Sequence, residues 1–343
     1  MSIARFAKLG AGALAALLAL FFGFAWSIDT DPLRGLYNLL KPTDSPAAGN
    51  PALVDVLDYR VSWLGDLESR RLAESSGLTA SQLHPGVLWS INDSGGDPEL
   101  FALDETGKHL AIISLPGLEA FDWESLDSFE HDGRSYIAIG DIGDNLGWRR
   151  QVRIIVVPEP ELLVDGLAEP AWEVSFVYPD GARDSESMAV DVKEHRILIL
   201  SKRDQPPRLY SVPVKAQGPV VATHLADLDH LPRLTQEDLE EELDGAQYRH
   251  MPSGMDYHAP TDRLLLTTLK HAYIYLLGDI TKSPVRVRLP TAGQREAITW
   301  VDAQRAIVSR ERPDQKGDAE LYEIAFSPRA AYAVPGADSP SER

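Results

Sequence analysis

The chain has no cysteine among its 343 residues. It can therefore form no disulfide, no thiolate metal site and no cysteine nucleophile. Basic residues are also scarce, because 33 Lys and Arg stand against 52 Asp and Glu and leave a formal charge of −19. This balance argues against nucleic acid as a partner, since nucleic acid selects a basic surface. It is compatible with a solvated acidic surface, with metal cations and with basic ligands.

One long uncharged run stands near the start of the chain. Arg5 and Lys8 precede it, it extends from Leu9 to Ile28, and Asp29 follows it. Twenty helical residues span about 30 Å, which is the thickness of the bilayer core. Basic residues ahead of such a run predict an N-terminus in the cytoplasm and a body outside it. Residues 1–28 are therefore expected to be a signal anchor, or a signal peptide if they are cleaved.

This interpretation places the protein in the cell envelope. An uncleaved segment would anchor it in the cytoplasmic membrane, with the body on the periplasmic or extracellular side, and a cleaved one would leave it secreted. Residues 29–53 are rich in Pro, Gly, Asp and Ser and are expected to be a linker, while residues 329–343 are expected to be a disordered tail.

Long helical patterns are largely missing between these segments, and five similar units of short strands take their place. The units open at Glu74, Glu124, Glu186, Ser253 and Glu296, so their starts are separated by 50, 62, 67 and 43 residues. Each opening strand leads through a turn to an apolar second strand with a polar end, then to a third strand and in most units to a fourth. Four antiparallel strands at this repeat length are typical of a β-propeller blade.

The last unit ends after its third strand, whereas Val56–Leu64 has no partner of its own. We predict that this stretch supplies the missing outer strand and closes the ring, which hides two sheet edges. The expected fold class is therefore all-β, a propeller of five blades over residues 54–328. Six blades remain an alternative if residues 210–250 contain a degenerate blade, and two stacked sheets are another.

The repeat also predicts where the polar residues meet. In an antiparallel hairpin the start of the first strand and the end of the second lie at the same rim, so both should face one mouth of the central channel. The oxygen donors expected there, as ligands of a divalent cation such as Ca²⁺, are Glu74, Glu124, Glu186, Glu296, Asn92, Asp93, Asp141, Asp144 and Asn145. The groups expected to bind an anionic ligand are Lys202, Arg203, Lys270, His271 and Arg310.

A bound cation is one of several ways to stabilise this acidic ring. The basic residues of the same rim would neutralise the glutamates, or some glutamates would remain protonated because like charges and burial raise the pKa of a carboxyl group. An acid at each strand entry would also serve a structural purpose by accepting hydrogen bonds from the backbone of a neighbouring blade. The sequence alone leaves these alternatives open.

Several motifs resemble a known group of proteins. "DWES" at 122–125, "GDIGDN" at 140–145 and "EAITW" at 296–300 resemble exported bacterial propellers related to the esterase-like phytase group. More distantly, they are similar to the regucalcin–gluconolactonase propellers, and the resemblance covers residues 60–326. It implies a divalent cation held at the channel mouth by Glu, Asn and Asp. Ser253 departs from the pattern, because it stands where a Glu is expected.

Two classes of function fit these observations. The first is a metal-dependent hydrolase of phosphoesters, esters or lactones, in which a rim glutamate acts as general base. The second is a non-enzymatic binding or scaffold propeller that recognises a protein, a glycan or a cation outside the cytoplasmic membrane. The expected partners are the membrane, through the N-terminal segment, and a small anionic ligand or a protein at the rim. No catalytic residue is assigned, since no G-x-S-x-G, H-E-x-x-H or phosphate-binding glycine loop occurs.

Overall fold

The structure is a computed structural model, and the parts of the chain that it describes are residues 30–40, 47, 49–93, 95–241, 248–289, 295–310 and 319–327. The predicted anchor at 1–28 and the predicted tail at 329–343 lie outside these residues. Within them, no helix has the length and apolar character that are needed to cross a bilayer.

The described strands form five sheets arranged around a common centre, as the prediction of a five-bladed propeller requires. Blade one contains β3 (Ser75–Ala80), β4 (Val87–Asn92), β5 (Glu99–Asp104) and β6 (His109–Ser114). Blade two contains β7 (Trp123–His131), β8 (Arg134–Asp141), β9 (Val152–Pro158) and β11 (Trp172–Val177). Blade three contains β12 (Ser185–Asp191), β13 (Arg196–Ser201), β14 (Arg208–Pro213) and β16 (Thr223–Asp227).

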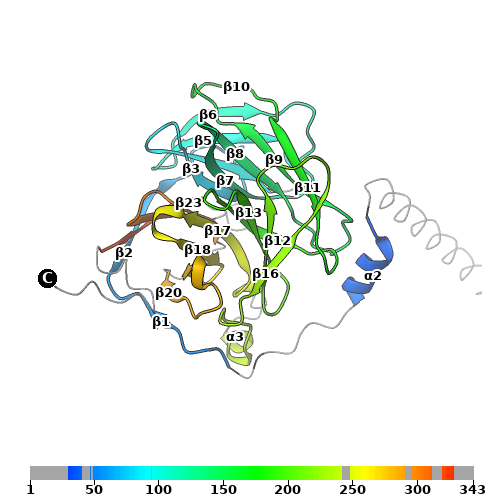
Figure 1. The fold of residues 1–343 in the computed structure, drawn as a ribbon. Helices are drawn as coiled ribbons and strands as arrows, with labels where there is room; N and C mark the ends of the chain where they lie inside the picture. The colour runs from blue at the N-terminus through cyan, green and yellow to red at the C-terminus, as the bar shows by residue number, and fades with distance from the viewer. Residues whose placement is uncertain are drawn as a thin grey trace, which may run out of the picture.

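Blade four contains β17 (Pro252–His258), β18 (Arg263–Thr268), β19 (His271–Leu276) and β20 (Val285–Arg288). Blade five contains β21 (Arg295–Trp300), β22 (Arg305–Arg310), β23 (Glu320–Phe326) and β2 (Tyr59–Asp66). Neighbouring strands within each blade are antiparallel, and the first strand of each blade in the chain is the innermost, except that β2 is the outermost strand of blade five. Figure 1 shows β3, β7, β12 and β17 near the centre, with the outer strands at the periphery.

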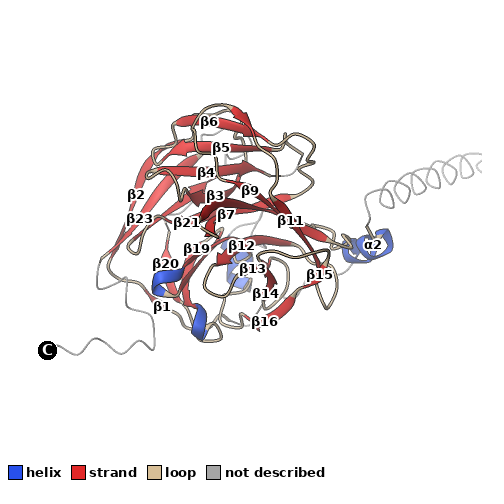
Figure 2. Ribbon diagram, turned by 45° about the horizontal axis from the view of Figure 1, so that its top comes forward, coloured by secondary structure: helices blue, strands red, loops and turns tan. Residues whose placement is uncertain are grey.

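Short elements decorate the outside of the ring. Three two-residue strands pair in parallel with outer strands: β1 (Val54–Asp55) with β20, β10 (Gly166–Leu167) with β6, and β15 (Val220–Val221) with β11. Within the described ranges, the helical elements are α2 (Pro32–Leu40), α3 (Gln236–Glu241) and the 3₁₀ turns η2 (Ala259–Thr261) and η3 (Leu277–Asp279). Figure 2 shows how little helix surrounds the strands.

The predicted closure of the ring by an N-terminal strand is confirmed. Strand β2 pairs antiparallel with β23, from Tyr59 opposite Phe326 to Asp66 opposite Glu320. This strand begins three residues later than the predicted Val56–Leu64, because the residues before it belong to a different blade. Val56 donates its backbone N–H to the carbonyl of Arg286 at 2.8 Å, at the edge of blade four. The N-terminal segment therefore ties blade four to blade five.

Adjacent blades pack through apolar layers. Ile154 and Phe176 of blade two are fully buried against Met188 and Ile197 of blade three, and equivalent clusters join the other blades. Innermost strands such as β12 are buried along their whole length, because they have a blade on either side. These strands accordingly show no regular alternation of polar and apolar residues, since both of their faces are covered, and their buried polar side chains need partners within the fold.

Polar side chains on the innermost strands also join neighbouring blades. The Asp127 carboxylate accepts a hydrogen bond from the backbone N–H of Val190 at 2.6 Å, and Asp256 accepts one from Trp300 at 2.5 Å. Burial raises the pKa of Asp127 and of Asp256, and these backbone donors oppose the rise. Asp127 and Asp256 therefore accept hydrogen bonds from the backbone of a neighbouring blade, which is the structural role that the sequence analysis left open for acidic residues. They lie further along the innermost strands than the residues at the rim.

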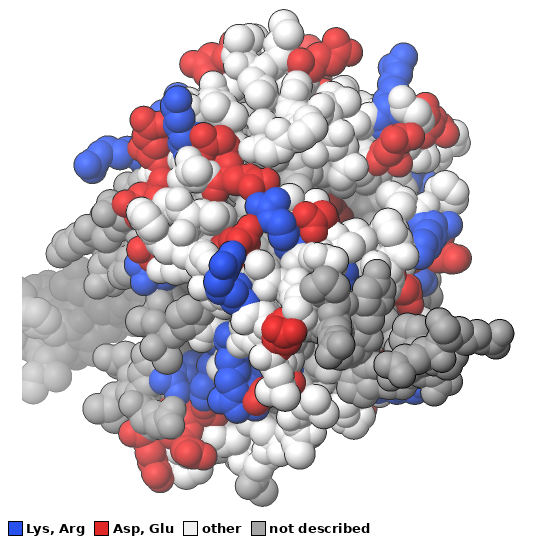
Figure 3. Space-filling view, turned by 90° about the vertical axis from the view of Figure 1, so that its left-hand side faces the viewer, with Lys and Arg blue, Asp and Glu red and all other residues white. Residues whose placement is uncertain are grey.

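Surface charge is mixed on the side of the molecule shown in Figure 3. Asp and Glu side chains lie among Lys and Arg there, so the negative excess does not form one continuous acidic surface on this face.

Candidate functional site at the channel mouth

One residue bulges out of the innermost strand in every blade. The register against the second strand shifts once near the start of each innermost strand, and the residue that the register skips there is Ser76, Glu124, Glu186, Ser253 or Glu296. A β-bulge adds one residue to a strand and changes the direction of its side chain, so that this side chain no longer follows the regular alternation between the two faces of the sheet. The five bulged residues therefore form an equivalent set around the mouth, with three glutamates and two serines.

The register places Ser76 at the position where the sequence suggested Glu74. Both blade one and blade two contain a Glu-Ser pair, but the pair in blade one stands two residues earlier along the chain relative to the bulge. The backbone N–H of Glu74 donates to Asn92 at 3.2 Å, and its carbonyl accepts from the N–H of Asp93 at 3.2 Å. Blade one therefore contributes a hydroxyl to the ring rather than a carboxylate.

The three bulged glutamates line one cavity of about 250 Å³ at the channel mouth. The described residues around it are Ser76, Asp93, Glu124, Asn145, Glu186, Lys202, Arg203, Tyr248, Leu269 and Glu296. Seven of the residues predicted from the sequence, five oxygen donors and two cations, are thus brought together here.

Three carboxyl groups converge on one side of this mouth. Asp93, Asp122 and Glu124 each place a carboxylate oxygen within 4.8 Å of the other two, and Asp122 and Glu124 are buried. Burial, followed by the charge of Asp93, raises the pKa of Asp122 to about 7. Burial, followed by the charges of Glu186 and Asp93, raises the pKa of Glu124 well above its ordinary value. The arrangement is costly when all three groups are ionised, and a cation between them would remove that cost.

The spacing of this cluster fits a hard divalent cation. Two oxygens bound to the same Ca²⁺ lie about 2.3–2.6 Å from the ion, so they are at most about 5 Å apart. The three oxygens, which lie within 4.8 Å of one another, meet this condition. Carboxylates are also the oxygen donors that Ca²⁺ prefers, whereas a softer metal would select nitrogen or sulfur.

Gly143 makes room for the cluster. A Cβ atom on this residue would lie 2.5 Å from both the Asp122 Cγ and the Glu124 Oε1. Its N–H donates to the Asp122 carbonyl at 3.2 Å, which holds the "GDIGDN" loop against the strand that carries Glu124. Only glycine allows the backbone to approach these two carboxyl groups so closely.

The cationic residues of the mouth are already paired with acids. Lys202 forms an ion pair with Glu186, and Arg203 donates its Nε–H to Asp184 at 2.5 Å and a second hydrogen bond to Asn145. Burial raises the pKa of Glu186, and the Lys202 ammonium opposes that rise. The Arg203 side chain is 37% exposed, so it still presents donors to the cavity.

Three predicted oxygen donors bind other parts of the protein. Asn92 accepts the N–H of Ala73 at 2.9 Å and thus holds the strand entry. Asp141 is buried between two guanidinium groups, with Arg149 at 2.8 Å and Arg153 at 3.0 Å. The third, Asp144, accepts two backbone N–H groups of its own loop, those of residues 148 and 149, each at 2.9 Å.

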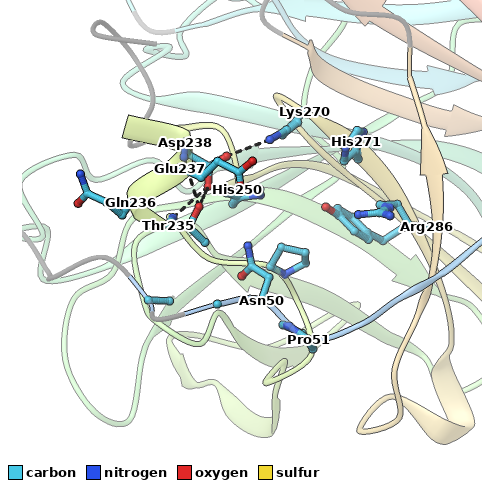
Figure 4. A pocket seen from close by; sticks show the side chains of 14 residues that line it. Asn50, Pro51, Thr235, Gln236, Glu237, Asp238, His250, Lys270, His271 and Arg286 are labelled. Atoms are coloured by element: carbon cyan, nitrogen blue, oxygen red, sulfur yellow. Dashed lines mark hydrogen bonds and ion pairs between the residues drawn. The ribbon is translucent and has the colours of Figure 1, made fainter. Parts of the chain in front are cut away.

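Lys270 and His271 line a different cavity, between α3 and the outer part of blade four. Figure 4 shows Lys270 directed toward Asp238, and the two charged atoms are 2.9 Å apart. His271 is partly buried in the same cavity. Burial, followed by the charges of Arg286 and the neighbouring lysine, lowers the pKa of this imidazole to about 4. The remaining predicted cation, Arg310, pairs with Glu320 at 2.6 Å.

Several residues of the mouth were not among the predicted ligands. Asp122 precedes Glu124 by two residues in the same "DWES" motif, so a recognisable signal for it was present. Ser76 could have been found by aligning the small residue after the bulge, which is Gly77, Ser125 or Ser187 in the first three blades. Tyr248 lies outside the repeat and had no such signal.

Comparisons with solved structures yield matches of low similarity. One is the PQQ-bound aldose sugar dehydrogenase from Streptomyces coelicolor, with 12% identity, a TM-score of 0.45, and coverage of 82% of this chain and 100% of that one. Another is a gluconolactonase from Xanthomonas campestris, with 13% identity, a TM-score of 0.43, and coverage of 84% and 99%. A nidogen/laminin complex matches at 12% identity and a TM-score of 0.44, covering 74% and 86%.

No protein-family model matches this chain, and neither does any curated protein sequence. The assignment of the chain as a five-bladed β-propeller rests on its own strand pairing.

Proposed function

We propose that the channel mouth binds one divalent cation, Ca²⁺ in the first instance, and that the protein is a cation-dependent hydrolase of a small anionic phosphoester, ester or lactone. The observation that carries this proposal is the convergence of Asp93, Asp122 and Glu124 beside Lys202 and Arg203, in and around a single cavity.

The charges of the cavity support the cation. Four carboxylates line it, those of Asp93, Glu124, Glu186 and Glu296, Asp122 joins the cluster beside it, and two basic residues stand against them. The excess is three negative charges when all seven groups are ionised, and one divalent ion would reduce it to one. An anionic substrate would meet stronger repulsion at the mouth without this ion than with it.

The residues divide into distinct roles in this proposal. Asp93, Asp122 and Glu124 would hold the cation, and a cation held there supplies a Lewis acid for the electrophilic centre of the substrate. Arg203 is the more exposed of the two cations and binds the anionic group of the substrate. Glu296 lines the same cavity, is only partly buried, and accepts the proton of the attacking water as general base.

A second candidate function is a non-enzymatic binding or scaffold propeller. One observation favours it, namely that Lys202 and Arg203 already form ion pairs with Glu186 and Asp184. Because these two basic side chains are already neutralised by acids of the protein, they attract an anionic substrate less strongly. In this case the mouth would bind the cation, and a protein or glycan would bind over it.

The proposed location is the cell envelope, with the body outside the cytoplasmic membrane. The uncharged run Leu9–Ile28 and the basic residues before it support this location. The motifs "DWES" and "GDIGDN" support a relationship to the exported propellers of the esterase-like phytase group. Cell fractionation with a C-terminal epitope tag tests the location, and recovery of the tagged chain in the cytosol would contradict it.

The test of the activity combines metal analysis with turnover. The purified protein is dialysed against Ca²⁺ and assayed with chromogenic phosphoesters, esters and lactones, with calcium and with chelator. We expect one bound ion per chain and turnover that chelator abolishes. Glu296→Gln should retain the ion and lose turnover, whereas Asp122→Asn should lose both. Glu130→Gln, an exposed change at the far end of β7, is the matched control and should retain both.

The outcomes separate the two candidate functions. Binding of the ion without turnover on any substrate would favour the binding propeller. Turnover that is equal in chelator and in calcium would contradict the role of the cation. Full activity of the Glu296→Gln protein would contradict the assignment of the general base.

A further inference from the structure

Helix α2 presents its polar side to the propeller. The N–H of Asp31, just before the helix, donates to the carbonyl of Trp148 at 2.6 Å. The Arg34 guanidinium donates to the carbonyl of Ala182 at 3.1 Å, and the Asn38 amide donates to that of Leu146 at 2.8 Å. These contacts bind the helix to the edge of the ring, where Figures 1 and 2 both show it.

The opposite side of the same helix is apolar and faces outward. Leu33 is 67% exposed, Leu36 38%, Tyr37 67% and Leu39 69%. Residues 33, 36 and 37 are three and four positions apart, so they lie on one face of the helix. A surface helix of a globular protein ordinarily buries its apolar face and exposes its polar one, and α2 does the reverse.

We infer that the outward face of α2 lies in the interfacial region of a lipid bilayer and holds the propeller against the membrane. This inference rests on the proposed membrane anchor. Three residues separate the uncharged run ending at Ile28 from the first residue of α2. Because an extended residue spans at most about 3.6 Å, α2 must begin within roughly 15 Å of the end of that run.

The charges around α2 suit an anionic membrane surface. A cavity of about 200 Å³ lies between the helix and blades two and three, and four arginines line it: Arg34, Arg149, Arg150 and Arg183. One acidic residue, Asp31, is the only carboxylate among the described residues of this lining. Two of these arginines are paired with acids within the fold, Arg149 with Asp141 and Arg183 with Asp180 and Asp204. Arg34 lies on α2 itself, and a basic residue on an interfacial helix attracts anionic headgroups.

The position of α2 relates this membrane contact to the channel mouth. Asn38 contacts the loop that follows Asn145, and Arg34 contacts the loop that precedes Asp184. Asn145 and Asp184 are the two residues that accept hydrogen bonds from Arg203. A bilayer that binds the outward face of α2 would therefore lie on the side of the ring that carries Arg203, with the helix between the two.

The absence of cysteine allows a direct test, because a single introduced thiol can be labelled uniquely. Tyr37→Cys and, as matched control, Leu57→Cys are made in the full chain. Leu57 is also an exposed apolar residue, at 92%, but it lies between β1 and β2. Both proteins are labelled with an environment-sensitive fluorophore and reconstituted into phosphatidylcholine–phosphatidylglycerol vesicles, with or without lipids that carry a quencher near the headgroup.

We expect the label at position 37 to shift to shorter wavelength and to lose most of its emission to the quencher lipids. The label at position 57 should behave as in water. Adding Leu33→Asp to the Tyr37→Cys protein should remove the shift while leaving its thermal melting unchanged, because Leu33 contacts solvent in the structure.

The outcomes distinguish this inference from the proposed anchor. If the chain floats with the vesicles but both labels remain in water, the inference about α2 is overturned and the anchor stands. If the chain does not float with the vesicles, the anchor fails, and the inference that rests on it fails too.

Discussion

Asp122→Asn is the substitution that separates a cation site from a purely structural cluster. The pKa of Asp122 rises from the usual 3.8 to about 7, mainly because the group is buried. One pKa unit corresponds to about 1.4 kcal/mol, so keeping this group ionised in the folded protein costs up to about 4 kcal/mol. The cost is absent below about pH 4, grows as the pH rises, and is complete above pH 7. The neutral amide removes it.

We therefore expect Asp122→Asn to raise the free energy of unfolding in chelator at pH 8, by about 1–4 kcal/mol. Calcium should stabilise the wild type by about 2.7 kcal/mol at a hundredfold excess over its dissociation constant. The variant should gain little, because it lacks one of three carboxylate ligands. Urea unfolding of both proteins at pH 5 and pH 8, with calcium and with chelator, measures all of these differences.

Asp141→Asn is the matched control in the same hairpin. Asp141 is buried between Arg149 and Arg153, so its replacement removes the carboxylate that these two guanidinium groups share. Breaking such a buried pair costs about 3–5 kcal/mol, and calcium should not change that loss. If Asp122→Asn behaved in the same way, with an equal loss of stability in calcium and in chelator, the reasoning about the cation would be refuted.

The ring and its mouth support three further predictions. A chain that begins at Leu67 lacks β2 and should aggregate, whereas one that begins at residue 46 should be monomeric in light scattering, because only the first exposes the edge of β23. Gly143→Ala should weaken calcium binding about tenfold or more in calorimetry, since its Cβ would lie 2.5 Å from a ligand oxygen of Glu124. Ser76→Glu should add a fourth carboxylate at the bulge, which lowers the melting temperature in chelator at pH 8 and raises the affinity for divalent ions. An unchanged melting temperature would show that this side chain does not face the ring.

The fold was predictable because the same pattern of strands and turns recurs five times in the sequence. Each blade contributes the same sequence of strands, so five weak signals agree on one architecture. The partner of β23 could be found by elimination, since one apolar segment near the N-terminus belonged to none of the five repeat units. Its first residue was predicted three positions too early, because Val54–Asp55 pairs with β20, and nothing in the alternation of residues marks that change of blade.

The site was less predictable because the register of a bulge is not visible in the sequence. Glu74 and Glu124 both precede a serine, and the displacement of the pair by two residues in blade one appears only in the pairing of β3 with β4. The sequence also could not show which acids are bound within ion pairs. Asp141 resembles the other acids at the strand ends, but Arg149 and Arg153, which lie beyond its own strand, fold back and enclose its carboxylate.

The pairing of β2 with β23 also fixes an order of assembly. Tyr59 and Phe326 are neighbours in the sheet but 267 residues apart in the chain. On the ribosome, or during passage through a membrane, the first strand of the ring to emerge is thus the last to find its partner. Four blades can form from local hairpins as they are synthesised, while β2 remains unpaired until β23 is available. Because loop closure over such a distance is slow, we expect these two strands to join late, after the blades between them have formed.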